Sequence, residues 1–277
     1  MDTAEPTLAS LQPEAIAFYA ESLRRLQASG LPFLVSGTYA INAYTGLRRP
    51  TKDIDVFCKA GDFPRILQLF PKPEFTITIE DERWLAKVHK GDYFFDVIFN
   101  STAGLGIITD QWFDENFKAE VLGVEVKLVP PTEMVFSKAF VQNRERYDGA
   151  DVAHMILRQH EHIDWHRLLC YMEAHWEVLL MHILNFRFIY PSEREIIPRW
   201  LLDELLDRLK LQEDLPTARI KICRGRLFSP HDYEIDVKQW GFADVVGRGE
   251  GVPVVPVDHG PEIARRVDGD RTSGAKD

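Results

Sequence analysis

The sequence predicts an α+β protein in which a mixed β-sheet with flanking helices is followed by a mostly helical domain. Up to about residue 150, short apolar runs typical of strands alternate with segments whose apolar residues recur at helical spacing. Glycines at positions 91 and 123 lie between alternating segments and indicate β-hairpins. From residue 152 to residue 212 the pattern is almost entirely helical. We therefore expect a sheet-containing core over residues 1–150 and a second, mostly helical domain over residues 151–245.

The expected elements of the first half follow from periodicity and turn chemistry. Residues 12–29 carry apolar side chains three or four apart, and Gly30 is a suitable stop for that helix. Strands are expected at residues 32–36, 53–59 and 75–80, with a helix at residues 38–45. A hairpin with strands at residues 84–89 and 92–100 is expected around Lys90-Gly91, and a second one around Leu122-Gly123.

In the second half of the chain the sequence pattern changes from mixed strands and helices to helices. Pro130-Pro131 ends the second hairpin, and a helix is expected from Thr132 to about Asn143, with the next one starting near Asp148. Dense apolar stripes then continue to about residue 211. Residues 246–277 are rich in Gly, Pro, Arg and Asp, and we expect this tail to be disordered.

Composition limits the class of protein. The 277 residues are 45% hydrophobic and 27% charged, which is ordinary for a soluble domain, and no apolar run approaches the roughly 20 residues of a membrane helix. The N-terminus lacks the features of a secretory signal, so a cytoplasmic location without membrane association is expected. Three widely spaced cysteines argue against a disulfide framework. A net charge of −10 argues mildly against a general nucleic-acid binder.

Two carboxylates lie close together on one expected strand of the core. Asp53 and Asp55 are two residues apart on an expected strand, so both side chains should leave the same face while Ile54 and Val56 point into the core. Adjacent carboxylates repel each other unless a cation lies between them. A divalent ion with hard oxygen ligands, Mg²⁺ or alternatively Mn²⁺, is the expected cofactor.

The turn before this strand has the features of a phosphate site. Ser36-Gly37 ends one strand and begins a helix, where backbone N–H groups and the positive end of the helix dipole favour an anion. Gly37 allows the backbone to approach a ligand closely. A phosphate site next to a metal-binding carboxylate pair predicts a nucleoside triphosphate (NTP) as substrate.

A third carboxylate is expected from a neighbouring strand. Asp96 lies within an otherwise apolar run, where an unpaired charge is costly. Three acids from two strands can hold two metals about 3.5–4 Å apart, the spacing used for in-line phosphoryl chemistry. Asp53, Asp55 and Asp96 are therefore the predicted catalytic and metal-binding residues, although a strand acid paired with an arginine is the simpler alternative for Asp96.

Ser36-Gly37, Asp53-x-Asp55 and Asp96 together resemble the active-site signature of the nucleotidyltransferase superfamily, which has the polymerase-β-like fold. The run from Arg49 to Asp55 looks most like a bacterial branch that includes toxins of abortive-infection systems, although the family commonly has Gly-Gly or Gly-Ser at the turn. The resemblance covers roughly residues 30–155.

The resemblance also implies roles for basic residues. Lys138, followed by Arg146, Asp148 and Asp151, resembles an element that follows the core in this branch and would let Lys138 reach the triphosphate. Arg49 and Lys52 lie beside the acids and are further candidates for binding phosphate. For each of these basic residues, a solvated surface charge is the alternative.

The implied reaction is metal-dependent transfer of a nucleoside monophosphate from an NTP to a hydroxyl. RNA or protein is favoured over a small molecule as acceptor, and the toxin-like relatives imply a possible cognate antitoxin. Alternatives are a catalytically silent nucleotidyltransferase-like antitoxin or scaffold, and a glycosyltransferase that uses Asp-x-Asp. Six histidines between residues 154 and 182 leave a zinc site conceivable, but exposed helix faces explain them more simply.

Overall fold

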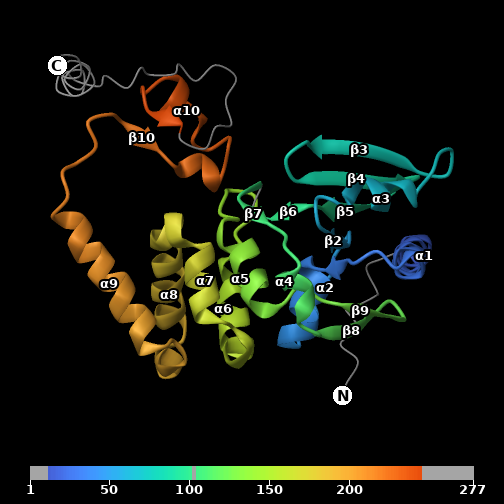
Figure 1. The fold of residues 1–277 in the computed structure, drawn as a ribbon, viewed down its shortest axis with the longest axis horizontal. Helices are drawn as coiled ribbons and strands as arrows, with labels where there is room; N and C mark the ends of the chain where they lie inside the picture. The colour runs from blue at the N-terminus through green and yellow to red at the C-terminus, as the bar shows by residue number, and fades with distance from the viewer. Residues whose placement is uncertain (1–11, 102–103, 245–277) are drawn as a thin grey trace, which may run out of the picture.

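The computed structural model describes residues 12–101 and 104–244, and it confirms the α+β class (Figure 1). A five-stranded mixed sheet in the first half is followed by a succession of helices. The predicted tail, residues 246–277, lies outside the described residues. The division at residue 150 stays a prediction.

The sheet has the strand order β1-β2-β5-β4-β3. Its central pair, β2 and β5, is parallel, and every other pair is antiparallel. Chain reversal in the antiparallel pairs and one crossover between β2 and β5 give the mixed sheet expected from the sequence. The strands span β1 (Leu34–Val35), β2 (Asp55–Phe57), β3 (Thr76–Asp81), β4 (Leu85–Lys90) and β5 (Tyr93–Ile98).

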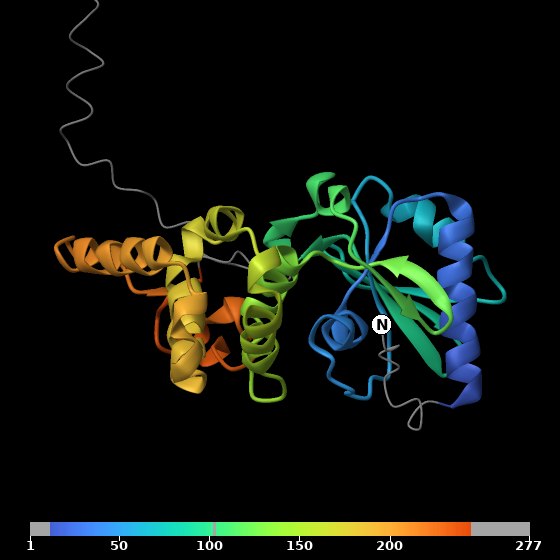
Figure 2. The ribbon, with the colours of Figure 1, turned by 90° about the horizontal axis from the view of Figure 1, so that it is seen from below.

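One face of the sheet is covered by α1 (Pro13–Ser29). Phe18 of this helix places its ring 5.9 Å from that of Phe95 in β5 and 6.4 Å from that of Phe75. Figure 2 shows α1 on one side of the sheet and the helices of the C-terminal half on the other. Because side chains alternate along β5, Phe95 and Val97 face α1, whereas Asp96 and Ile98 face the other way.

The remaining elements of the first half pack around the sheet. The helix α2 (Gly37–Thr45) follows β1, and the hydroxyl of Tyr44 donates a hydrogen bond to the carbonyl of Val129, 2.8 Å away, which ties α2 to the chain beyond the second hairpin. Short elements connect the strands: α3 (Phe63–Gln68), β6 (Asn100–Ser101), β7 (Gly106–Ile107), α4 (Gln111–Asp114), β8 (Lys118–Val121) and β9 (Val124–Lys127).

The second half is mainly helical. In the centre of this half, α6 packs against α2, α5 and α8, so the helices continue the core of the sheet region. Bulky apolar side chains such as Leu168, Ile183, Phe186 and Leu205 are buried between the helices. The elements are α5 (Pro131–Ala139), α6 (Gly149–Gln159), α7 (Trp165–Tyr171), α8 (Trp176–Ile189), α9 (Arg199–Glu213), β10 (Ile222–Cys223), α10 (Glu234–Lys238) and β11 (Ala243–Asp244), with short 3₁₀ turns at His160–His162, Glu173–His175, Pro191–Ile196 and Gly225–Leu227.

Composition predicts neither a disulfide framework nor a membrane helix. All three cysteines are free thiols in the structure. Within residues 12–101 and 104–244, no helix combines the length and the hydropathy that crossing a bilayer requires.

The contact between α1 and the sheet gives a stability prediction. Phe95→Ala should lower the free energy of unfolding by about 3–5 kcal/mol. Removal of the large ring, which contacts Phe18 and Phe70, leaves a cavity in the core. Phe188→Ala, at a position where the ring is 85% exposed, is the matched control and should change stability by no more than about 0.5 kcal/mol. Urea unfolding followed by fluorescence measures both, and equal losses would contradict the assigned packing.

Candidate active site

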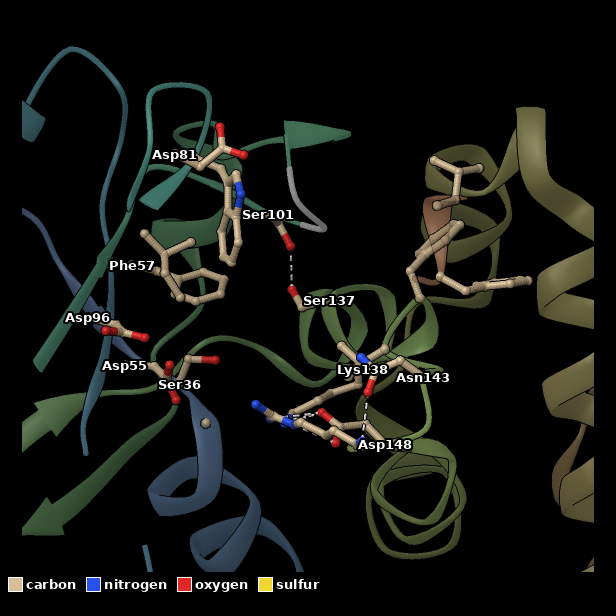
Figure 3. Close-up of a pocket in the computed structure, with 18 of the residues that line it drawn as sticks. Ser36, Asp55, Phe57, Asp81, Asp96, Ser101, Ser137, Lys138, Asn143 and Asp148 are labelled. Carbon is tan, nitrogen blue, oxygen red and sulfur yellow. Dashed lines mark hydrogen bonds and ion pairs between the residues drawn. The ribbon is translucent and has the colours of Figure 1, made fainter. Parts of the chain in front are cut away.

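A cleft of about 470 Å³ separates the face of the sheet opposite α1 from the α5–α6 region. Asp55 and Asp96 line it from the sheet, and Ser36 and Gly37 line it where β1 passes into α2. Lys138, Asn143 and Asp148 lie on the opposite wall (Figure 3). The cleft therefore brings together residues that are about 100 positions apart in the sequence.

The parallel pairing of β2 with β5 positions the two carboxylates. Asp55 is the direct register partner of Asp96, and Phe57 is the partner of Ile98. Residues paired in register on neighbouring strands point to the same face, about 4.8 Å apart along the hydrogen-bonding direction. Val56 and Val97 alternate to the opposite, buried face. The predicted approach of Asp96 to Asp55 is thus a consequence of sheet register.

Asp53 occupies a different position from the other two acids. The strand β2 begins at Asp55, two residues later than predicted, and Asp53 is not among the residues that line the cleft. The hydroxyl of Thr51 lies 3.1 Å from both the carbonyl and Oδ1 of Asp53, and this local hydrogen bonding competes with extension of the strand. Asp53 nevertheless acts on the cleft electrostatically, because its charge contributes to raising the pKa values of Asp55 and Asp96.

Gly37 is required by its contact with Asp55. A β-carbon at position 37 would lie 1.7 Å from Oδ2 of Asp55, and Gly37 has a φ of +62°, in the left-handed region. The amide of Ser36 donates a hydrogen bond to the carbonyl of Asp55, 2.9 Å away, which fixes this approach. The hydroxyl of Ser36 is buried and lies 3.9 Å from Sδ of Met134. The predicted turn therefore lies directly against one of the predicted acids.

The two cleft carboxylates have different surroundings. Burial, reinforced by the charges of Asp53 and Asp96, raises the pKa of Asp55 to about 6, although Lys138 and Arg146 act in the opposite direction. Among the described residues, no hydrogen-bond or ion-pair partner of the Asp55 carboxylate is found. Burial also raises the pKa of Asp96, against the opposing effect of Lys87.

Lys87 in β4 is a partner of Asp96 that we did not predict from the sequence. Its Nζ lies 2.7 Å from Oδ1 of Asp96. The simpler alternative of a strand acid paired with a basic side chain is therefore realised, but with a lysine. The position of the hairpin turn would have predicted this pair. Lys90 pairs with Tyr93, so the two-residue turn is Gly91-Asp92. With that turn, Lys87 lies directly opposite Asp96.

A charged cluster forms the wall opposite the acids. Lys138 is buried, and its Nζ lies 2.7 Å from Oδ2 of Asp148 and 3.3 Å from Oδ2 of Asp151. Arg146 donates two hydrogen bonds of 2.9 Å to the carboxylate of Asp148, and Arg49 pairs with Asp151. With three cations and two anions, this cluster carries a net charge of +1 and faces the negative side of the cleft.

The predicted phosphate-binding residues are thus only partly brought together. Ser36, Gly37 and Lys138 line the cleft, but Arg49 and Lys52 do not. Arg49 joins the cluster behind Lys138 through Asp151. Lys52 is exposed, and its carbonyl accepts a hydrogen bond from the hydroxyl of Tyr19, 2.5 Å away.

Several cleft residues had no recognisable signal in the sequence. Trp84, Phe140 and Phe228 supply apolar surface, and Arg83 and Arg226 supply charge. Phe228 packs near Phe140, with ring centroids 6.3 Å apart and ring planes tilted by 33°, so the segment around residue 228 closes one side of the cleft. Nothing in the local sequence at that segment distinguishes it from any other loop.

Whether a divalent ion fits the cleft depends on which side chains are available to bind it. Among the described residues, no group of three or more His, Cys, Asp or Glu side chains is arranged to hold a metal ion. Mg²⁺ is, however, usually held by one or two carboxylates, with phosphate oxygens and water completing its shell. The unpaired carboxylate of Asp55, next to Asp96 and to the N–H groups at the start of α2, fits that second description.

Comparisons with known proteins give structural similarities only. No protein family and no curated protein matches the chain. Its fold is similar to that of the lincosamide antibiotic adenylyltransferase LnuA with bound lincomycin, at 13% identity and a TM-score of 0.37, over 52% of this chain and 96% of that chain. It is also similar to the antibiotic-resistance factor ANT(2'')-Ia, at 14% identity and a TM-score of 0.40, over 67% of this chain and 97% of that chain. An antigenic nucleotidyltransferase-like protein from Paracoccidioides brasiliensis shares 13% identity at a TM-score of 0.41, over 67% of this chain and 93% of that chain.

These solved structures are described as adenylyltransferase, resistance factor and nucleotidyltransferase-like protein. None of the three is described as an abortive-infection toxin, so that narrower assignment stays a prediction. All three share only 13–14% identity with this chain, at TM-scores no higher than 0.41.

The contact between Gly37 and Asp55 gives a second prediction. Gly37→Ala should destabilise the protein by more than the roughly 1–2 kcal/mol of left-handed backbone strain, because the new methyl group also collides with the carboxylate. Gly30→Ala is the matched control, since Gly30 has a φ of +69° but open space around the missing side chain. Urea denaturation compares the two variants, and similar losses would contradict the close contact at Gly37.

The unpaired carboxylate gives a third prediction. Because the pKa of Asp55 is about 6 in the folded protein and 3.8 as its ordinary value, the folded state binds more protons between pH 4 and 6. The free energy of unfolding should therefore fall as pH rises through this window. Asp55→Asn should remove that part of the pH dependence and stabilise the metal-free protein at pH 7.5 by up to about 3 kcal/mol. Thermal unfolding at several pH values checks both, and parallel pH profiles for the two proteins would contradict the raised pKa.

Proposed function

We propose that this protein is a metal-dependent nucleotidyltransferase that moves a nucleoside monophosphate from an NTP to a hydroxyl and releases pyrophosphate. The observation that supports it best is the pairing of Asp55 with Asp96 on one face of the sheet, directly against the Gly37 turn. Carboxylates for a cation and backbone N–H groups for a phosphate then lie within one cleft.

The acids have distinct proposed roles. Asp55, with Asp53 and Asp96 beside it, would hold Mg²⁺ or Mn²⁺ when the substrate is bound, and the ion would neutralise charge on the phosphoryl group. Asp96 is in addition the proposed acceptor of the proton from the attacking hydroxyl. Its raised pKa supports this role, because a base with a pKa nearer neutrality accepts a proton more readily at pH 7.

The triphosphate would bind between the two walls of the cleft. Ser36 and Gly37 would hold phosphate oxygens at the N-terminus of α2, and Lys138 would contribute charge from the opposite side. Arg49 would act indirectly, because its contact with Asp151 leaves less negative charge to compensate Lys138. Lys52 is a weaker candidate, since it is exposed and does not line the cleft.

The acceptor and the biological context are proposed from the sequence resemblance. We favour a hydroxyl of RNA or protein over one of a small molecule, in the cytoplasm, with a cognate antitoxin as partner. The net charge of −10 makes a broad, nonspecific contact with nucleic acid unfavourable, so an RNA acceptor would be bound at a local site.

Two observations favour a second candidate function. Asp96 already has a cationic partner, and no group of three ligating side chains is found within the described residues. A nucleotidyltransferase-like protein that has lost catalysis and serves as an antitoxin or scaffold would show these features. A thermal-shift assay with MgATP, MgGTP, MgCTP and MgUTP separates the two, since a silent protein of this kind should show no stabilisation.

A labelling assay gives the fourth prediction. Asp96→Asn should reduce transfer of α-³²P-labelled nucleotide to total cell RNA or protein by at least about 100-fold, because it removes a negative charge beside the metal site and the proposed proton acceptor. Asp92→Asn is the matched control: Asp92 is an exposed residue in the turn before β5 and should leave labelling unchanged. Equal labelling by Asp96→Asn and the wild type, with normal thermal unfolding, would exclude Asp96 from the mechanism.

A further inference from the structure

An ion pair joins Lys87 of β4 to Asp96, one of the two acids that line the cleft. Nζ of Lys87 lies 2.7 Å from Oδ1 of Asp96 and 4.0 Å from the ring centroid of Phe94. Two attractive contacts, one ionic and one cation–π, therefore hold the ammonium group at one place beside Asp96. Its side chain is 21% exposed, so solvent only partly screens the pair.

The sheet itself fixes this pair. Lys87 is the register partner of Asp96 in the antiparallel β4–β5 ladder, while Asp55 is its partner in the parallel β2–β5 ladder. The three side chains consequently leave one face of three neighbouring strands, with Asp96 in the middle. The register makes Lys87 and Asp96 direct neighbours, and a one-residue slip that separated them would also turn Phe95 and Val97 out of the core.

The two cleft acids differ in whether they already have a cation. Asp96 has the ammonium of Lys87, whereas within residues 12–101 and 104–244 the carboxylate of Asp55 has no ion-pair partner. A divalent ion on Oδ1 of Asp96 would have to displace a lysine held by two contacts or lie next to it against strong repulsion. A divalent ion at Asp55 meets no such competitor.

We propose that Lys87 takes the place of a second divalent cation, so that the site binds one divalent ion, at Asp55, together with the triphosphate. Lys87 is a positioning residue in this arrangement, since it acts through Asp96. Its hydrogen bond occupies Oδ1 of Asp96 and leaves Oδ2 for the hydroxyl of the acceptor. The proposal rests on the nucleotidyltransferase function and specifies the number of metals that this function uses.

The test counts metal ions directly. Mn²⁺ is titrated, with detection by electron paramagnetic resonance, into the full-length protein saturated with α,β-methylene-ATP or with the corresponding GTP, CTP or UTP analogue. The wild type should bind one Mn²⁺ per bound nucleotide. Lys87→Met should bind two, and so should Lys87→Gln, which keeps a polar side chain in case the methionine variant folds poorly.

Two further variants exclude a merely structural effect. Lys87→Arg keeps the positive charge and should return the count to one. Lys90→Met, on the same strand, removes a lysine that pairs with Glu21 and Glu74 away from the cleft, and should also give one.

Two Mn²⁺ ions in the wild type, or one in both neutral variants, would overturn the proposal. If no analogue binds to the wild type with Mn²⁺, the nucleotidyltransferase function fails and this proposal fails with it. The nucleotide-binding readout separates that outcome from a wrong metal count.

Discussion

The parallel register of β2 and β5 is the constraint on which the cleft depends. It places Asp55 opposite Asp96, and the antiparallel pairing of β1 with β2 brings Gly37 against the same carboxylate. Both contacts are maintained by backbone hydrogen bonds and by apolar residues on the opposite face, such as Val56 and Val97. A one-residue slip would move the acids into the core, so the energy that stabilises the sheet also holds the cleft in place.

The two walls of the cleft carry charges of opposite sign. The sheet contributes acids whose pKa values are raised by burial and by nearby carboxylates, and the α5–α6 region contributes a buried lysine compensated by Asp148 and Asp151. Burying the acids without full pairing destabilises the free protein. Such an arrangement is typical of sites that gain stability when a charged ligand binds. A cationic ligand at Asp55 and an anionic one near Lys138 would together compensate the charges on both walls of the cleft.

Much of the fold was accessible from the sequence because its signals are local. The helix that ends at Gly30, the turn at Ser36-Gly37, and the hairpin strands that carry Asp96 all follow from periodicity and turn chemistry. Element boundaries were less accurate. The hydroxyl of Thr51 bonds to the backbone and side chain of Asp53, so β2 begins at Asp55, and the hairpin turn lies one residue later than predicted.

The sequence by itself determined the α+β class, the acidic strand and the glycine turn, because each depends on residues that are close together in the chain. Only the tertiary structure decided which acids share a face, that Lys87 pairs with Asp96, and that Phe228 closes the cleft against Phe140. These contacts join segments whose spacing along the chain carries no information about their distance in space. Strand register and helix packing, which depend on burial across the whole core, set that distance.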